Sequence, residues 1–194
     1  MESTALRRPG GRAADVTRRI NEAVLALLVD GGIDACTFQN IAARADIDRS
    51  TLYRRFPDRW PMIIGAIVAL AERETPVAET GSFKGDLFAA LCRVAEVLTG
   101  PLGPPLMNVA AALLAGEAPG ERARFWESRR KQLDPMFDAG IARGELAPDV
   151  DREEVFEMAA GPLYFRTFVS GRPLDEAYIH QVVEQVCDHY SARC

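Results

Sequence analysis

The chain has 194 residues, of which 48% are hydrophobic and 26% charged, and its formal net charge is -5. A chain of this length can bury a core without metals or disulfides, and the composition is typical of globular proteins. The sequence contains no run of about 18 or more apolar residues, so no transmembrane helix is predicted. No apolar stretch follows the N-terminal arginines, so a secretory signal is not predicted either. The four cysteines form no CxxC pair, which favours a reducing cytoplasm over a disulfide framework. They are Cys36, Cys92, Cys187 and Cys194.

The charge is distributed unevenly. Residues 1–60 contain ten arginines and eight acidic residues, whereas residues 61–194 carry a net charge of -7. An acidic chain is poorly suited to indiscriminate binding of nucleic acid, but it can still present one local basic face.

The apolar spacing predicts three short helices at the N-terminal end. An apolar stripe from Val16 to Leu28 predicts a first helix that ends at Gly31-Gly32. Thr37 is expected to cap a second helix, and after the break at residues 46–48 a third helix turns Leu52 and Phe56 toward the core.

The rest of the chain also follows helical periodicity. Asp58 is expected to cap a connecting helix over 61–75, with Pro61 tolerated in its first turn, and residues 75–82 to form a linker. Further helices are expected at 83–99, at 106–115 as a buried helix, from 119 with a kink or break at Asp134-Pro135, from 151 to 168 with a kink at Pro162, and after Pro173. No strand alternation persists, so the predicted fold is all-α. It has a flexible basic arm at 1–14, a three-helix head at 15–60, and a larger helical body at 61–194.

The second and third helices have the spacing of a helix-turn-helix, whose second helix can lie in the major groove of DNA. Arg49, Ser50 and Thr51 would lead that helix, and arginine can bind guanine with two hydrogen bonds. Tyr53 shares a face with Arg49, and hydroxyls and arginines suit phosphate oxygens. The predicted DNA-binding residues are Thr37, Arg49, Ser50, Thr51, Tyr53, Arg54, Arg55 and Arg59. The alternatives are a purely structural helix pair and, for Arg49, a solvated helix start.

This segment resembles the DNA-binding head of the tetracycline repressor (TetR) family of bacterial transcriptional regulators. The resemblance rests on Thr37, Ile41-Ala42, Ala45, Ile47, the Ser-Thr-Leu-Tyr run at 50–53, Phe56 and Arg59. The stretches GIARGELAPDVD and GPLYFRTFVSGRPLDE also look like the C-terminal domains of such regulators. Asp46 stands where the family often has glycine, Arg55 where histidine is frequent, Arg59 where lysine is usual, and Trp60 where glutamate is common.

The resemblance implies a homodimer that binds double-stranded DNA at a palindromic operator. It also implies an unknown small-molecule effector that binds in the body, moves the connecting helix and weakens operator binding. The large side chains expected to line the pocket, with core packing as the alternative, are Phe88, Met107, Leu114, Phe125, Trp126, Phe137, Met158 and Tyr164. Polar candidates for orienting the ligand, with the protein surface as the alternative, are Asn108, Arg122, Arg129, Gln132 and Arg166. The expected dimer interface, with packing inside one chain as the alternative, is Gly161, Phe165, Phe168, Ile179, Val182 and Val186.

Signals for an enzyme are poor. The two histidines are His180 and His189, and Cys187 stands two residues from the latter, so they do not share a helix face and a metal site is not expected. No phosphate-binding GxxxxGK[ST] motif occurs, and no cofactor is expected. The rival function is an all-helical interaction or small-molecule-binding module without specific DNA binding. A further hypothesis places Arg7, Arg8 and Arg12 in a minor-groove arm, with a disordered tail as the alternative.

Overall fold

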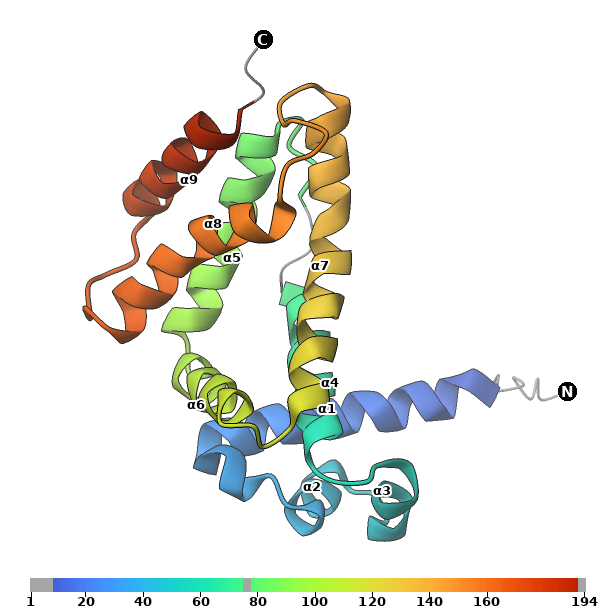
Figure 1. The fold of residues 1–194 in the computed structure, drawn as a ribbon. Helices are drawn as coiled ribbons and strands as arrows, with labels where there is room; N and C mark the ends of the chain where they lie inside the picture. The colour runs from blue at the N-terminus through green and yellow to red at the C-terminus, as the bar shows by residue number, and fades with distance from the viewer. Residues whose placement is uncertain (1–8, 75–77, 192–194) are drawn as a thin grey trace, which may run out of the picture.

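The computed structural model describes residues 9–74 and 78–191, which form nine α-helices and no strand (Figure 1). Their bounds are α1 (Pro9–Ala35), α2 (Phe38–Ala45), α3 (Arg49–Arg55), α4 (Trp60–Glu74), α5 (Phe83–Thr99), α6 (Gly103–Leu114), α7 (Pro119–Ala142), α8 (Arg152–Phe168) and α9 (Glu176–Tyr190). The all-α prediction is therefore confirmed for the described part of the chain. None of these helices is by itself long and apolar enough to cross a membrane, and the one pair that reaches the length together, α5 and α6, is bent by 93°.

Local side-chain contacts explain where the head helices begin and end. The backbone angles of α1 depart from helical values at Gly31 and Gly32. Gly32 has a φ of 67°, which glycine adopts without steric cost. The Asn40 N–H donates to the Thr37 hydroxyl oxygen over 3.1 Å, so Thr37 caps α2 as expected. The Ser50 N–H donates to the Asp48 carboxylate over 2.7 Å and fixes the start of α3.

The turn between α2 and α3 uses a left-handed residue that is not glycine. Asp46 has a φ of 50° and a ψ of 54°, and its N–H closes the end of α2. Aspartate tolerates this conformation better than most residues, so it can stand where the family often has glycine. Arg19 of α1 donates to the Asp46 backbone carbonyl and lies 3.0 Å from its carboxylate. The turn is therefore tied to the first helix.

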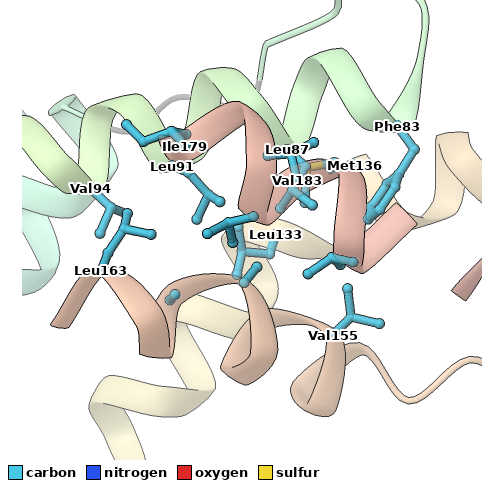
Figure 2. Packing of buried hydrophobic residues seen from close by; sticks show 14 of the residues in the cluster. Phe83, Leu87, Leu91, Val94, Leu133, Met136, Val155, Leu163, Ile179 and Val183 are labelled. Carbon is cyan, nitrogen blue, oxygen red and sulfur yellow. The ribbon is translucent and has the colours of Figure 1, made fainter. Parts of the chain in front are cut away.

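The buried apolar residues form two clusters, one in the head and one in the body. The head cluster joins α1 to α4 and includes Val109 and Leu113 of α6. The body cluster is formed by α5, α7, α8 and α9, with Leu91, Leu133, Leu163 and Val183 among its members (Figure 2). Because α4 and α6 contribute to the head cluster, the packing of the head extends beyond the boundary expected at residue 60. Figure 1 shows α6 beside α1, at the end of the body that faces the head.

Several expected boundaries differ from the structure. The first helix begins at Pro9, so residues 9–14 of the expected arm are helical, while Arg7, Arg8 and Thr75 lie outside the described residues. The helix expected at 106–115 begins earlier, because α6 starts at Gly103 and its first turn accommodates proline. That helix is also less buried than expected, since only Gly103, Val109 and Leu113 are enclosed.

The expected break at Asp134-Pro135 does not occur, since α7 runs continuously to Ala142. Proline removes one helical hydrogen bond and crowds the preceding turn. Here Pro135 faces solvent, so water can bind the backbone carbonyl that lacks a helical hydrogen bond because of the proline. The next two side chains, Met136 and Phe137, are each only 1% exposed. Tertiary packing of these two side chains therefore outweighs the local preference.

Candidate nucleic-acid interface and body cavity

Helix α3 turns one face into the head and the other to solvent. Leu52 is fully buried and anchors the helix, while Arg49, Ser50, Tyr53 and Arg54 are exposed. The Tyr53 ring stacks on Phe38 at the start of α2, with 4.5 Å between ring centroids and 3° between the planes. The Arg49 guanidinium lies 5.7 Å from the Tyr53 ring centroid. Stacking therefore holds these two polar side chains in place on the surface of a seven-residue helix.

An open hollow beside α3 brings together four of the predicted DNA-binding residues: Thr37, Arg49, Tyr53 and Arg59 line its wall. It also includes the start of α2 and the start of α4, so it spans both sides of the helix-turn-helix. A concave, arginine-bearing surface at helix starts suits a phosphate backbone. Thr51 is half-buried, and Ser50 and Arg54 extend the polar surface along α3.

Two of the predicted DNA-binding arginines also bind within the head. Arg55 donates to the Thr17 hydroxyl over 3.2 Å. Arg59 donates to the Ile33 backbone carbonyl over 3.2 Å and lies 3.8 Å from the Asp34 carboxylate. Both contacts join the helix-turn-helix to α1. No local pattern predicts these pairings, because Thr17 is 38 residues from Arg55 and Ile33 is 26 residues from Arg59 along the chain.

The body contains a cavity of about 420 Å³ between α4, α6, α7 and α8. Its wall is mostly apolar, and the exposed charges Arg122 and Glu157 lie on it with opposite signs. Four of its residues, Ile64, Ile67, Val109 and Leu113, also belong to the head cluster. The cavity therefore lies where the body meets the head.

Five of the eight predicted pocket residues line this cavity: Met107, Leu114, Phe125, Trp126 and Tyr164. The other three do not. Phe137 is buried beside a separate space of about 240 Å³ between α7 and α8. Phe88 stacks on His180 with 3.8 Å between ring centroids, between α5 and α9. Met158 is exposed on α8, and its sulfur accepts a hydrogen bond from the Tyr190 hydroxyl at 3.1 Å.

A smaller space of about 80 Å³ adjoins the cavity and shares six of its lining residues, among them Phe125, Phe156 and Tyr164. Arg129 lines this inner space and is only 7% exposed. Burial lowers the pKa of Arg129 from its ordinary value, and the neighbouring Tyr164 partly offsets this. Tyr164 as a whole is 40% exposed, but desolvation of its phenol group raises the pKa of that group, while Arg129 acts in the opposite direction. Of the other polar candidates, Arg122 lines the main cavity and Arg166 donates to the Pro173 carbonyl.

The predicted dimer residues fall into two groups. Ile179, Val182 and Val186 of α9 are at most 4% exposed and lie in the body cluster, where Ile179 extends toward α5 (Figure 2). They are packed inside one chain, which was the alternative for this stripe, and are not available to a second chain. Phe165 is 60% exposed, Gly161 is exposed beside the cavity, and Phe168 is half-buried against the body cluster.

Within the described residues, no group of three or more His, Cys, Asp or Glu side chains is arranged to hold a metal ion.

Comparison with known proteins gives a consistent result. The family model described as bacterial regulatory proteins, tetR family, matches residues 20–59, and the one described as tetracyclin repressor-like, C-terminal domain, matches residues 77–186. The chain is 32% identical to the DNA-binding transcriptional repressor TetR of Mycobacteroides abscessus over 84% of this chain and 86% of that one. It is 29% identical to the HTH-type transcriptional regulator YdeS of Bacillus subtilis over 86% of this chain and 85% of that one.

Solved structures agree with the fold. The TetR family transcription regulator SCO0332 superposes with a TM-score of 0.76 at 24% identity, covering 93% of this chain and 99% of that one. The flavonoid-responsive regulator FrrA superposes with a TM-score of 0.64 at 20% identity, covering 93% of this chain and all of that one.

Proposed function

The chain belongs to the TetR family of helix-turn-helix transcriptional regulators, and from that premise we propose that it is a ligand-responsive repressor. It binds a palindromic operator as a homodimer, and a small molecule that enters the body cavity releases it. A protein that binds the chromosome in this way acts in the cytoplasm. The members of this family are regulators and not enzymes, and the chain is a regulator of that kind.

The observation that carries DNA binding is the exposed face of α3. Arg49, Ser50 and Arg54 extend from a helix whose opposite side is anchored by Leu52, so the helix can enter a major groove without exposing the core. Arg49 at the leading turn is suited to a guanine edge, and Tyr53 with the open hollow is suited to phosphates.

The position of the cavity supports a ligand response. Ile64 and Ile67 of α4, and Val109 and Leu113 of α6, line the cavity and pack in the head cluster. A ligand that separates α4 from α6 therefore shifts side chains against which α1 rests, because packed cores do not deform continuously. Among the relatives, the M. abscessus protein is named a repressor and FrrA is named flavonoid-responsive, which favours the same behaviour here.

The exposed stripe of α8 supports dimerisation. Met158, Phe165 and Val169 recur at helical spacing and are 41%, 60% and 70% exposed. We expect Phe165→Glu to convert the dimer to a monomer in sedimentation velocity, because it places a charge at the centre of an apolar contact. Val29→Glu is the matched control, since Val29 is an exposed apolar residue on α1. Equal behaviour of the two variants would move the interface away from α8.

The decisive experiment is the selection of random DNA duplexes by the purified protein at a fixed, moderate salt concentration, followed by sequencing. A palindrome with half-sites about one helical turn apart, or a multiple of that, is the expected result. An Arg49→Ala variant should then lose preference at particular base positions only. If a folded dimer selects no sequence, the repressor proposal fails and an interaction module without specific DNA binding becomes the better account.

A further inference from the structure

The body cavity of about 420 Å³ has two walls of different chemistry. The wall formed by α7 and α8 contains the aromatic side chains that line the cavity among the described residues, namely Phe125, Trp126, Phe156 and Tyr164. The wall formed by α4 and α6 consists of aliphatic side chains and one methionine: Ile64, Ile67, Leu106, Met107, Val109, Ala110, Leu113 and Leu114. A ligand between the two walls therefore contacts rings on one side and aliphatic groups on the other.

Two of the rings on the aromatic wall lie edge to face. The centroids of Phe125 and Trp126 are 5.2 Å apart, and their planes meet at 70°. Aromatic rings prefer offset stacking or edge-to-face contact, so this pair can bind a third ring in either of these arrangements. Tyr164 of α8 adds another ring to the same wall. The α7 and α8 side of the cavity is therefore suited to a flat aromatic body.

The buried side chains of the cavity wall are apolar within the described residues. They are Ile64, Ile67, Val109, Leu113 and Ala160, each at most 7% exposed. The charged residues on this wall, Arg122 and Glu157, are exposed to solvent and opposite in sign. A charged ligand group placed against the buried side chains would leave water without an opposite charge beside it, which is costly. The wall therefore favours an uncharged ligand.

Arg129 does not change this expectation. It lines the adjoining 80 Å³ space and lies outside the wall of the main cavity. Its Nη1 donates to Gln132 Oε1 over 2.8 Å, and its guanidinium lies 5.6 Å from the Phe156 ring centroid. Arg129 thus already has contacts within the chain, and its charge is no reason to expect an anion in the main cavity.

We propose that the cavity binds an uncharged molecule with a flat aromatic body. One face of its rings lies against Phe125, Trp126 and Tyr164, and the other lies against the aliphatic side chains of α4 and α6. This inference rests on the proposed function, because it assigns the chemical class of the effector to the cavity that the proposed function uses.

Three competitors of similar size separate ring character from charge. The uncharged dye N-phenyl-1-naphthylamine reports occupancy of the cavity by its fluorescence. It is displaced by 2-naphthol, which is flat and uncharged at neutral pH, by decahydro-2-naphthol, which has the same skeleton without aromatic rings, and by naphthalene-2-sulfonate, which adds a negative charge. Ala110→Phe, which fills the cavity, should weaken binding of the dye at least about fivefold, whereas Ala111→Phe should leave it unchanged.

The competitors are compared on wild type, Tyr164→Leu, Tyr164→Phe and Phe88→Leu. Tyr164 is 40% exposed, so its replacement leaves the core intact, and Tyr164→Phe keeps the ring but removes the hydroxyl. Phe88→Leu is the matched control, because Phe88 stacks on His180 away from the cavity wall. Thermal denaturation monitored by circular dichroism verifies that each variant is folded. Trp126→Leu replaces Tyr164→Leu if that variant does not fold, since Trp126 is 52% exposed on the same wall.

We expect 2-naphthol to displace the dye from wild type at roughly a third or less of the concentration that decahydro-2-naphthol requires, because only the aromatic compound gains ring contacts. The sulfonate should require roughly tenfold more than 2-naphthol, because its charge must leave water. Tyr164→Leu should lower the preference for 2-naphthol over the saturated compound by about twofold, whereas Tyr164→Phe and Phe88→Leu should retain it. Equal affinities of 2-naphthol and the saturated compound, a sulfonate that binds as tightly as 2-naphthol, or a dye that still binds Ala110→Phe as it binds wild type would overturn the inference.

The result is separable from the test of the proposed function. If the dye binds in the cavity but the saturated compound or the sulfonate competes as well as 2-naphthol, the ligand class is wrong while a ligand cavity remains. If wild type does not bind the dye, both the inference and the cavity as an effector site fail. If the competitors behave as expected but no palindrome is selected, the ligand class stands and the repressor proposal fails.

Discussion

Arg54 and Arg59 should respond differently to substitution by alanine, although both are arginines of the helix-turn-helix. Arg54 is exposed on α3. Arg59 donates to the Ile33 carbonyl and lies 3.8 Å from the Asp34 carboxylate, so part of its charge is already used within the head. Each phosphate contact contributes roughly 0.9 to the slope of log K against log salt concentration. A dimer places one Arg54 on each of two half-sites, so Arg54→Ala removes two phosphate contacts and should reduce this slope by about 1.8.

Arg59→Ala should change the slope by less than half of that amount and should instead lower stability. Loss of its hydrogen bond to the Ile33 carbonyl is worth about 1 kcal/mol, which corresponds to a fall of about 2–4 °C in melting temperature for a chain of this size. Operator affinity is measured by fluorescence anisotropy at several salt concentrations, and stability by thermal denaturation. Arg18→Ala, which removes an exposed arginine from α1, is the control and should leave the slope unchanged.

An Arg59→Ala variant that loses as much slope as Arg54→Ala, with an unchanged melting temperature, would refute this reasoning. Arg59 would then leave Ile33 and bind a phosphate when DNA arrives.

Substitutions at Asp46, Cys36 and Ala110 test other parts of the molecule. Asp46→Gly should leave the melting temperature nearly unchanged, whereas Asp46→Ala should cost about 1 kcal/mol, because alanine fits a φ of 50° poorly; equal melting temperatures would contradict this. Burial raises the pKa of Cys36 to about 11, so at pH 8 its thiolate fraction should be about a hundredfold below that of an ordinary thiol with a pKa near 9, and Cys36→Ser should remove only a slow phase of labelling by a thiol reagent. The corresponding share of folding free energy is present below pH 9 and is lost as the pH rises through 11. Ala110→Phe, which fills the cavity, should weaken operator binding in the absence of ligand by at least about fivefold. The control Ala111→Phe, at the next position of α6, should leave operator binding unchanged. Equal effects of the two variants would mean that filling the cavity does not affect the head.

The elements of the head could be predicted because their signals are local. Thr37, Asp48 and the Gly31-Gly32 pair act within a few residues of themselves through caps and backbone geometry. The structure places the starts of α2 and α3 where these signals indicate, and Gly31-Gly32 interrupts α1, which then continues to Ala35. The pairings of Arg55 with Thr17 and of Arg59 with Ile33 could not be predicted, because they depend on how helices far apart in sequence come together.

In the body, too, the contacts of predicted residues could not be derived from the sequence. The stripe of Ile179, Val182 and Val186 has the spacing of a contact face, and spacing alone does not distinguish a partner chain from the same chain. In the same way, a large apolar side chain such as Leu114 is compatible both with the predicted cavity wall and with core packing, which was the alternative. Only the arrangement of α6 against α4, α7 and α8 decides between them.

The cavity lies between the two apolar clusters, and its two ends belong to different parts of the molecule. Phe156 and Ala160 on its α8 side pack with the body cluster, whereas Ile67 and Val109 on the opposite wall pack in the head cluster. A ligand can shift an equilibrium between two head arrangements only by binding one of them better. A ligand group that touches only Phe156 and Ala160 meets the same side chains in either arrangement, so it contributes affinity but little discrimination. A ligand group that reaches Ile67 and Val109 contacts side chains that move with the head, so the length and bulk of the ligand determine how strongly it weakens operator binding.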